Sequence, residues 1–194
     1  MDYDLPKHVL VGQQELEVRY DFRVILEIFE ALNDPDLSDQ ERAFVVLQMF
    51  YLDFQQITDF EEAIKSLFWF INGGKNEENS QKKQPQIVSW EQDFPYIIAP
   101  VNRVLGYEAR TVSYDPKSNT GGVHWWTFLS AYMEIGECLF AQIVAIRSKR
   151  ARGKKLDKTD QEFYQKNRAL IDIKRRYTEK EDDLVKLWTR KEQP

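Results

Sequence analysis

The chain has 194 residues and a mass of 23.1 kDa; 42% of its residues are hydrophobic and 30% are charged, and its mean hydropathy is -0.58. This balance excludes a disordered chain and a protein built of membrane spans, since no apolar stretch reaches the roughly 18 residues that a spanning helix needs. A single cysteine, Cys138, excludes an internal disulfide and a cysteine-based metal site. The acidic start lacks the basic region of a secretory signal, so we expect an intracellular protein with one domain.

Charge is distributed unevenly along the chain. Residues 1–100 hold 8 Lys and Arg against 19 Asp and Glu, whereas residues 101–194 hold 19 against 13. Much of the positive charge lies in residues 147–158, which read RSKRARGKKLDK. Such a run can attract phosphate groups, but a solvated helix end has the same composition, and the run lacks an aromatic ring on which bases could stack. The opposite charges of the two halves also suit head-to-tail contacts between copies of the chain.

The first element predicted is a β-hairpin. Residues 8–11 are a short apolar run, residues 12–14 supply a turn, and residues 15–20 alternate between polar and apolar side chains. A lone hairpin is marginally stable in water, so we expect this one to lie on the helices that follow.

Three helices are predicted after the hairpin, each with a recognisable first residue. Asp21 can cap a helix that ends before Pro35, because the residue before a proline disfavours helix. Ser38 and the glutamate three residues later form a capping box for a second helix. Asp59 begins a third, which the glycine pair at residues 73–74 ends.

A polar segment is predicted to separate two lobes. Residues 75–86 have no apolar side chain except a proline, which predicts a mobile loop between an N-terminal lobe (1–74) and a C-terminal lobe (87–194). In the second lobe a helix begins after Ser89. Pro100 lies deep within its pattern, where we expect a kink or a break into two pieces.

One long helix is predicted at the centre of the second lobe. Apolar residues recur at four-three spacing over residues 123–149, and Gly136 within this pattern is expected to permit close approach of another helix. A loop with a short extended piece at 109–112 precedes this helix, and shorter helices begin at Thr159 and Thr178. The predicted fold is therefore mainly α, with about six to seven helices and a small N-terminal hairpin.

Residues that could perform catalysis are few and generic. The chain has no glycine-rich phosphate loop, dinucleotide fingerprint, zinc-protease motif or nucleophile elbow. His124 and Cys138 fall in the long predicted helix, which favours packing over roles as a base or a thiolate. Asp172 and Lys174 have the acid-x-lysine spacing of some nucleases, but the triplet is common by chance and its partner acid, with Asp36 a candidate, is not placed by sequence. We predict no enzyme activity, no cofactor and no metal.

Adjacent aromatic residues are the more informative group. Neighbouring rings in residues 68–70 and 125–126 point about 100° apart around a helix, so they cannot share one pocket. Either the helices are buried on two sides within the chain, or one ring of each group faces a partner. The candidate partner-binding residues are aromatic and basic: Trp69, Trp125, Trp126, Phe128, Arg147, Lys149, Arg150 and Arg152.

Three stretches of the sequence resemble a known family. They are YDFR at residues 20–23 with the segment through DPDLSD, WEQD at 90–93, and HWWTFL at 124–129 running on to Ile146-Arg147. Together they are similar to the bacteriophage "gene product fifteen" family, which comes from long-tailed phages and prophages of Gram-positive bacteria. The resemblance implies an accessory product of the tail-morphogenesis gene cluster. The family has no established catalytic residues, so none are carried over.

The resemblance also implies a function. Relatives in the same cluster resemble tail assembly chaperones, which bind the long helical tape measure protein and help the tail tube polymerise on it. We therefore expect a non-enzymatic protein that binds tape measure or tail tube subunits in the host cytoplasm. One alternative is a minor tail protein that stays in the virion. A second is a nucleic-acid binder that uses residues 147–158, although neither nucleic acid nor a membrane is an expected partner.

Overall fold

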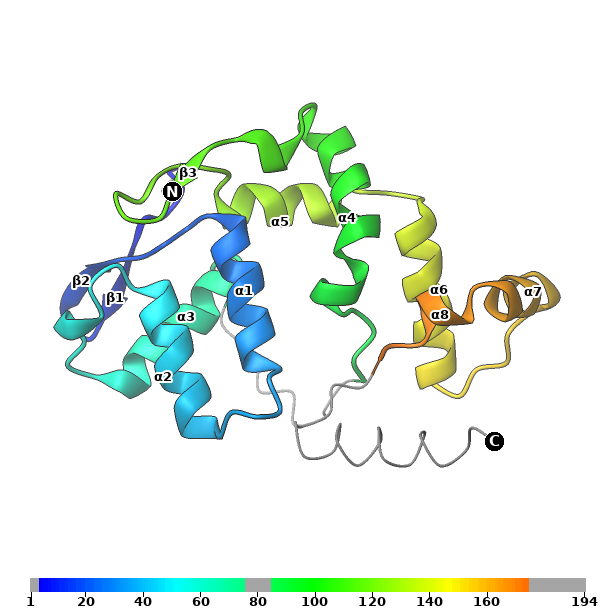
Figure 1. Ribbon diagram of the computed structural model, residues 1–194, viewed down its shortest axis with the longest axis horizontal. Helices are drawn as coiled ribbons and strands as arrows, with labels where there is room; N and C mark the ends of the chain where they lie inside the picture. Colours follow the sequence, from blue (N-terminus) through cyan, green and yellow to red (C-terminus); the bar gives the residue numbers. More distant parts are fainter. Residues whose placement is uncertain (1–3, 76–84, 175–194) are drawn as a thin grey trace, which may run out of the picture.

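A computed structural model describes residues 4–75 and 85–174 (Figure 1). Within these ranges the chain forms eight α-helices, two short 3-10 helices and two small antiparallel sheets, so the fold is mainly α, as predicted. None of the described helices is long and apolar enough to cross a membrane. Most of the loop predicted at 75–86, and all of the helix predicted to begin at Thr178, lie outside the described residues.

The N-terminal hairpin forms where the sequence predicts it. Strands β1 (His8–Val11) and β2 (Gln14–Glu17) are antiparallel, with Val9 opposite Leu16. Both of these side chains are buried. Strand β1 packs against helix α3 (Phe60–Ile71), whose Ser66 hydroxyl donates a hydrogen bond to the Leu10 carbonyl. The hairpin thus gains the support that two short strands need.

The first helices begin at the predicted caps. The Asp21 carboxylate accepts from the second backbone N–H of α1 (Phe22–Leu32). Ser38 forms the predicted capping box at the start of α2 (Asp39–Phe50), and the Asp59 carboxylate caps α3 by accepting from the Glu62 backbone N–H. A short 3-10 helix, η1 (Phe54–Gln56), joins α2 to α3.

Helix α4 (Trp90–Leu105) is a single helix that runs through both of its prolines, so of the two alternatives predicted at Pro100, a kink or a break, the break does not occur. Ile97, three residues before this proline, and Val101, directly after it, are fully buried. Their core packing outweighs the lost backbone hydrogen bond. The helix ends at Gly106, whose left-handed conformation has φ +78°.

The single long helix predicted at 123–149 is wrong, because the structure has two helices there. Helix α5 (Trp125–Met133) and helix α6 (Leu139–Ala151) are separated by a turn in which Gly136 has φ +62°. A Cβ atom at Gly136 would have no neighbour within 4 Å, so this glycine serves the turn and not the close approach of a helix. The Cys138 sulfur then accepts from a backbone N–H as the cap of α6.

The segment before α5 also differs from the prediction. Residues 109–111 form a 3-10 helix, η2 (Ala109–Thr111), where an extended piece was expected. The extended backbone lies further on, in a small hairpin of β3 (Tyr114–Asp115) and β4 (Thr120–Gly121). This shift reflects the Asp-Pro turn at residues 115–116, which lies inside the hairpin instead of after it.

Two short helices end the described chain. Helix α7 (Lys158–Lys166) is capped by Asp157, whose carboxylate accepts from the Asp160 backbone, and not by Thr159 as predicted. Aspartate is at least as good a cap as threonine. With Asp157 as the cap, the helix begins at Lys158, one residue before Thr159. Helix α8 (Arg168–Ile171) follows directly.

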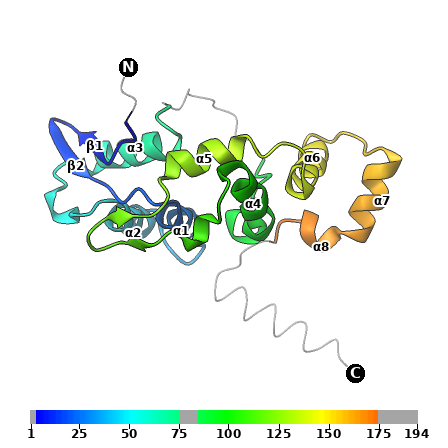
Figure 2. The ribbon, with the colours of Figure 1, turned by 90° about the horizontal axis from the view of Figure 1, so that it is seen from above.

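Two clusters of buried side chains hold these elements together. The larger one joins the hairpin to helices α1 to α5, and the smaller one consists of Ile143, Ile146 and Ile171 on α6 and α8. Helix α4 connects them, since it packs against α1, α5 and α6. Two perpendicular views place the hairpin, α2 and α3 at one end of the long axis and α7 at the other (Figure 1, Figure 2).

Candidate protein-interaction surface

Trp125 and Phe128, two of the predicted partner-binding residues, lie in the main core. Trp125 is 1% exposed, and its indole nitrogen donates to the Ile71 carbonyl at 2.8 Å. Phe128 is fully buried and stacks on Phe22, with ring centroids 4.6 Å apart. Neither ring is accessible to a partner, so Trp125 and Phe128 are not part of the candidate interaction surface. Their role is to hold α5 against α1 and the end of α3.

Trp69 and Trp126 differ from them, because both rings are only partly buried. The two rings meet edge to face with centroids 5.5 Å apart. The indole nitrogen of Trp126 donates to the Phe70 carbonyl at 2.8 Å, which fixes the orientation of the ring. Adjacent tryptophans on α5 thus take the two roles that the sequence left open: Trp125 packs inward, and Trp126 reaches the surface.

Gly74 makes room for the Trp126 ring. Its backbone has φ +81°, and a Cβ atom there would lie 2.8 Å from the end of the indole. Contacts this short essentially never occur for a real Cβ atom, so any side chain at this position must displace the ring.

We expect Gly74→Ala to lower the free energy of unfolding by about 1–3 kcal/mol, since both the left-handed backbone and the ring oppose the added methyl. Urea denaturation measures this loss. Gly12→Ala is the matched control, because Gly12 has φ +62° but nothing within 4 Å of its Cβ position. Equal losses in the two variants would show that the contact with Trp126 contributes nothing.

An open apolar groove adjoins Trp126. It has a volume of about 480 Å³ and lies between the end of α4 and one side of α5. Leu5 and Val104 in its walls remain 45% and 41% exposed. The residues that line it are Leu5, Val104, Leu105, Trp126, Thr127, Ser130, Ala131 and Glu134. Sequence reasoning missed this groove because its walls come from three segments far apart in the chain.

His124 caps α5 as a neutral imidazole. Its Nδ1 accepts from the Trp126 backbone N–H at 3.0 Å, and its Nε2 donates to the Pro6 carbonyl at 2.8 Å. A donor facing one nitrogen and an acceptor facing the other require the neutral tautomer with hydrogen on Nε2. Burial lowers the pKa of His124 below its usual 6.5, and the positive charge of Lys7 acts in the same direction.

Stability should therefore fall when the medium is acidified below about pH 6.5, because the unfolded chain binds the His124 proton more tightly than the folded chain. The contribution of neutral His124 to the free energy of unfolding is complete above the pKa of histidine in the unfolded chain, and it is lost as the pH falls below that value. Urea denaturation between neutral pH and about pH 5 measures this slope. His124→Asn keeps a capping oxygen and removes the titration, so its profile should be flatter. A profile as steep as that of the unmodified chain would contradict the assignment.

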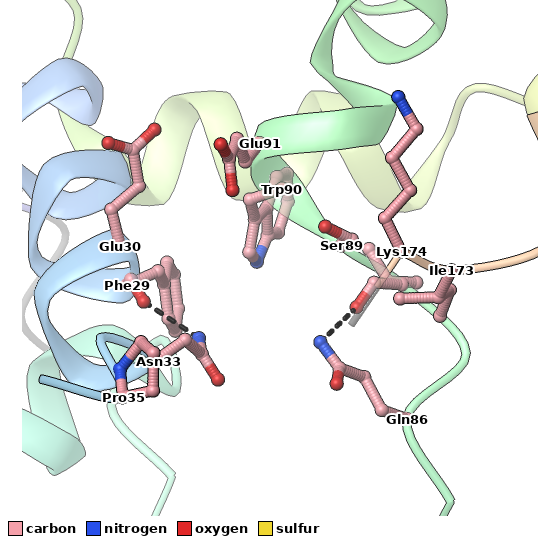
Figure 3. A pocket seen from close by; sticks show the side chains of 11 residues that line it. Phe29, Glu30, Asn33, Pro35, Gln86, Ser89, Trp90, Glu91, Ile173 and Lys174 are labelled. Atoms are coloured by element: carbon pink, nitrogen blue, oxygen red, sulfur yellow. Dashed lines mark hydrogen bonds between the residues drawn. The ribbon is translucent and has the colours of Figure 1, made fainter. Parts of the chain in front are cut away.

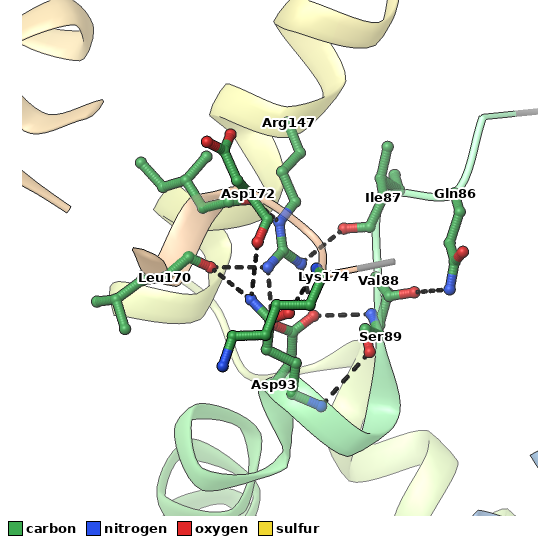
Figure 4. A network of polar contacts seen from close by, with 11 residues as sticks. Gln86, Ile87, Val88, Ser89, Asp93, Arg147, Leu170, Asp172 and Lys174 are labelled. Carbon is green, nitrogen blue, oxygen red and sulfur yellow. Dashed lines mark hydrogen bonds and ion pairs between the residues drawn. The ribbon is translucent and has the colours of Figure 1, made fainter. Parts of the chain in front are cut away.

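Arg147, predicted at a partner surface, instead forms a buried ion pair with Asp93 (Figure 4). The guanidinium donates to both carboxylate oxygens, at 2.6 and 2.9 Å, and the two side chains are 4% and 0% exposed. Further hydrogen bonds reach the carbonyls of Ile87, Leu170 and Ile171. Burial removes Arg147 from the candidate surface and makes it a link between α4, α6 and α8. Asp93 was missed because an acid at the start of a helix usually faces solvent.

Other basic residues of 147–158 are divided between paired and unpaired cations. Lys149 forms an ion pair with Asp157, and Arg150 forms one with Asp172. These pairs reduce the positive charge that phosphate groups could contact, which weakens the case for a nucleic-acid site. Four exposed cations form no ion pair with any described residue: Arg152, Lys154, Lys155 and Lys158.

A pocket of about 540 Å³ lies between α1 and α4 (Figure 3). Phe29 and Trp90 stack in its wall with centroids 5.8 Å apart. The Asn33 amide donates to the Phe29 carbonyl and the Gln86 amide to the Val88 carbonyl, so both amides are satisfied locally. The two amides in the lining are therefore engaged within the chain.

The nuclease interpretation gains no support from the geometry. Asp172 accepts hydrogen bonds from Arg150 and from the Tyr164 hydroxyl, so its carboxylate is engaged within the chain. Within 4–75 and 85–174, no three His, Cys, Asp or Glu side chains are grouped so as to hold a metal ion.

The comparison with known families agrees with the resemblance seen in the sequence. A family model described as Bacteriophage Gp15 protein matches residues 1–173. The match covers most of the chain, so the chain belongs to this phage family. Membership indicates a structural or morphogenesis protein of phages, a class that is generally non-enzymatic. No curated protein and no solved structure matches the chain.

Proposed function

We propose that this chain is a non-enzymatic tail morphogenesis protein that binds tape measure or tail tube subunits in the host cytoplasm. The observation that carries the proposal is the apolar groove beside Trp126. A groove between two helices can accept the apolar face of a third helix, and a tape measure protein is a long helical partner. The fixed, partly exposed ring of Trp126 is the kind of rigid anchor that binding sites favour.

The residues that line the groove support a partner of a particular chemistry. Leu5 and Val104 are exposed apolar residues of the lining that a partner's leucine or isoleucine would cover. Glu134 supplies a negative charge to the lining. A helix with one apolar stripe and a basic residue beside it fits this arrangement.

Calorimetric titration with the tape measure protein and the tail tube protein of the same phage tests the proposal. One of the two should bind, and Val104→Arg should weaken binding at least about tenfold, or about 1.4 kcal/mol, by filling the groove with a charge. Leu10→Arg is the matched control, since Leu10 is an exposed apolar residue (65%) on the hairpin. Failure to bind either tail protein would contradict the proposed function, and binding indifferent to Val104→Arg would contradict the groove.

Purified virions separate a chaperone from a minor tail protein. A chaperone should be absent from the particle or present far below the amount of tail components, as quantitative mass spectrometry would show. A stoichiometric amount would contradict the chaperone role and favour the structural one.

A further inference from the structure

Three phenylalanines form a row at the end of the molecule that holds α2 and α3, with the partly buried Phe54 between the exposed Phe44 and Phe60. Phe44 and Phe54 meet edge to face with centroids 4.9 Å apart, and Phe54 and Phe60 are 5.8 Å apart. Phe44 is 48% exposed and Phe60 is 51% exposed. Burying such a ring fully is worth about 1.5–3 kcal/mol, so a row of rings left in water favours a surface that covers it.

An acidic residue lies close in sequence to each ring of this row. Glu41 lies one helical turn before Phe44, and Asp53 and Asp59 each directly precede one of the other rings. These three acids are exposed and form no ion pair with any described residue. Residues 38–65 together hold six acidic residues against Arg42 and Lys65, which form ion pairs with Asp39, Glu61 and Glu62. We call this patch, with its three rings, the acidic phenylalanine surface.

The complementary charge lies at the opposite end of the same chain. The turn between α6 and α7 presents four exposed cations, and the half-buried Leu156 lies among them. We call this segment, residues 152–158, the basic turn. Both views place α7 at the far end of the long axis from α2 and α3 (Figure 1, Figure 2). One copy therefore cannot bring its own basic turn to its own acidic surface.

We propose that copies of this chain associate head to tail, with the basic turn of one copy on the acidic phenylalanine surface of the next. The methylene stems of Lys154 and Lys155 would cover the rings while their charged ends meet Asp53 and Asp59. Cations over the faces of the phenylalanines add to this attraction. The inference does not depend on the proposed tail function, since it uses neither the groove nor a phage partner.

The position of the two surfaces determines the kind of assembly. The acidic phenylalanine surface and the basic turn differ from one another, so the contact between copies is heterologous. Every assembly, whatever its length, leaves one acidic phenylalanine surface and one basic turn unoccupied at its ends. Association should therefore continue beyond two copies, in contrast to a symmetric dimer, which stops there.

Sedimentation velocity of the purified chain tests this association. The average mass should exceed the 23.1 kDa of one copy and rise with protein concentration. It should fall when the salt is raised from about 0.1 M to about 1 M, because the Debye length shrinks from about 10 Å to about 3 Å. A chain that stays monomeric up to its solubility limit in low salt, or that stops at a dimer, would overturn the proposal.

Two variants test the direction of the contact. Phe44→Ser with Phe60→Ser removes two rings of the acidic phenylalanine surface. Lys154→Glu with Lys155→Glu reverses the charge of the basic turn. Each variant alone should be monomeric. In their mixture, the basic turn of the phenylalanine variant can still bind the acidic phenylalanine surface of the lysine variant. The mixture should therefore give a one-to-one heterodimer that grows no further. Lys117→Glu with Lys166→Glu makes the same change in net charge elsewhere on the surface and should leave association unchanged.

Association that persists in both variants would overturn the proposal, as would a mixture that grows beyond two copies or forms no heterodimer. Circular dichroism checks that each variant is folded. If the phenylalanine variant does not fold, the lysine variant still decides the matter, because it changes only exposed side chains on a turn. Undiminished association in that variant contradicts the role of the basic turn.

Discussion

Asp93→Ala should lower the free energy of unfolding by about 3–5 kcal/mol, the loss typical when one partner of a buried ion pair is removed. Arg147 would stay charged and almost fully buried, with backbone carbonyls around it but no negative charge. The interface of α6 and α8 with α4 depends on this pair, so the smaller core should loosen first. Urea denaturation followed by circular dichroism measures the loss.

The double variant Asp93→Leu with Arg147→Met provides the control. It removes both charges at once, so no unpaired ion is buried, and it should be considerably more stable than Asp93→Ala. A loss below about 1 kcal/mol for Asp93→Ala would mean that the pair is open to water and does not hold the helices together.

Trp125→Ala should cost about 3–5 kcal/mol, the range for removing a large aromatic side chain from a core. Trp125 is 1% exposed and contacts the rings of Phe29, Trp90 and Phe128. The variant also leaves the Ile71 carbonyl without its indole donor. Thermal or urea unfolding measures the loss.

Trp126→Ala is the matched comparison, because the two tryptophans are neighbours on one helix and each donates one indole hydrogen bond. Its loss should be smaller, since the Trp126 ring is already partly exposed, while its effect on partner binding should be larger. A greater loss of stability for Trp126→Ala than for Trp125→Ala would contradict the placement of the two rings.

Local signals in the sequence predict much of this fold. The hairpin and the caps at Asp21, Ser38 and Asp59 follow from short-range hydrogen bonds that a few neighbouring residues determine. The split between α5 and α6 was missed because the four-three apolar spacing continues across the turn at Gly136. Helix α5 ends at Met133, and the left-handed Gly136 turns the chain before α6 begins, although the apolar pattern goes on.

The candidate surface is harder to predict, because it depends on contacts between distant segments. Periodicity alone assigns Trp125 and Trp126 to different faces, but only the packing of α1 and α3 decides which of them is buried. Arg147 lies in a basic run that suggests exposure, and its burial depends on Asp93, 54 residues away in the chain. Phe44 and Phe60 have the spacing of core residues and are nevertheless about half exposed.

Site-specific photocrosslinking from Ser130 in phage-infected cells tests most directly whether the groove binds a tail protein. Ser130 is exposed and lines the groove, so a photoreactive residue there lies within reach of whatever occupies it. The control carries the photoreactive residue at position 111 instead, in place of the exposed Thr111. The groove proposal predicts a crosslink to the tape measure or tail tube protein from position 130 and none from position 111. A folded chain that crosslinks to neither protein from position 130 would contradict it.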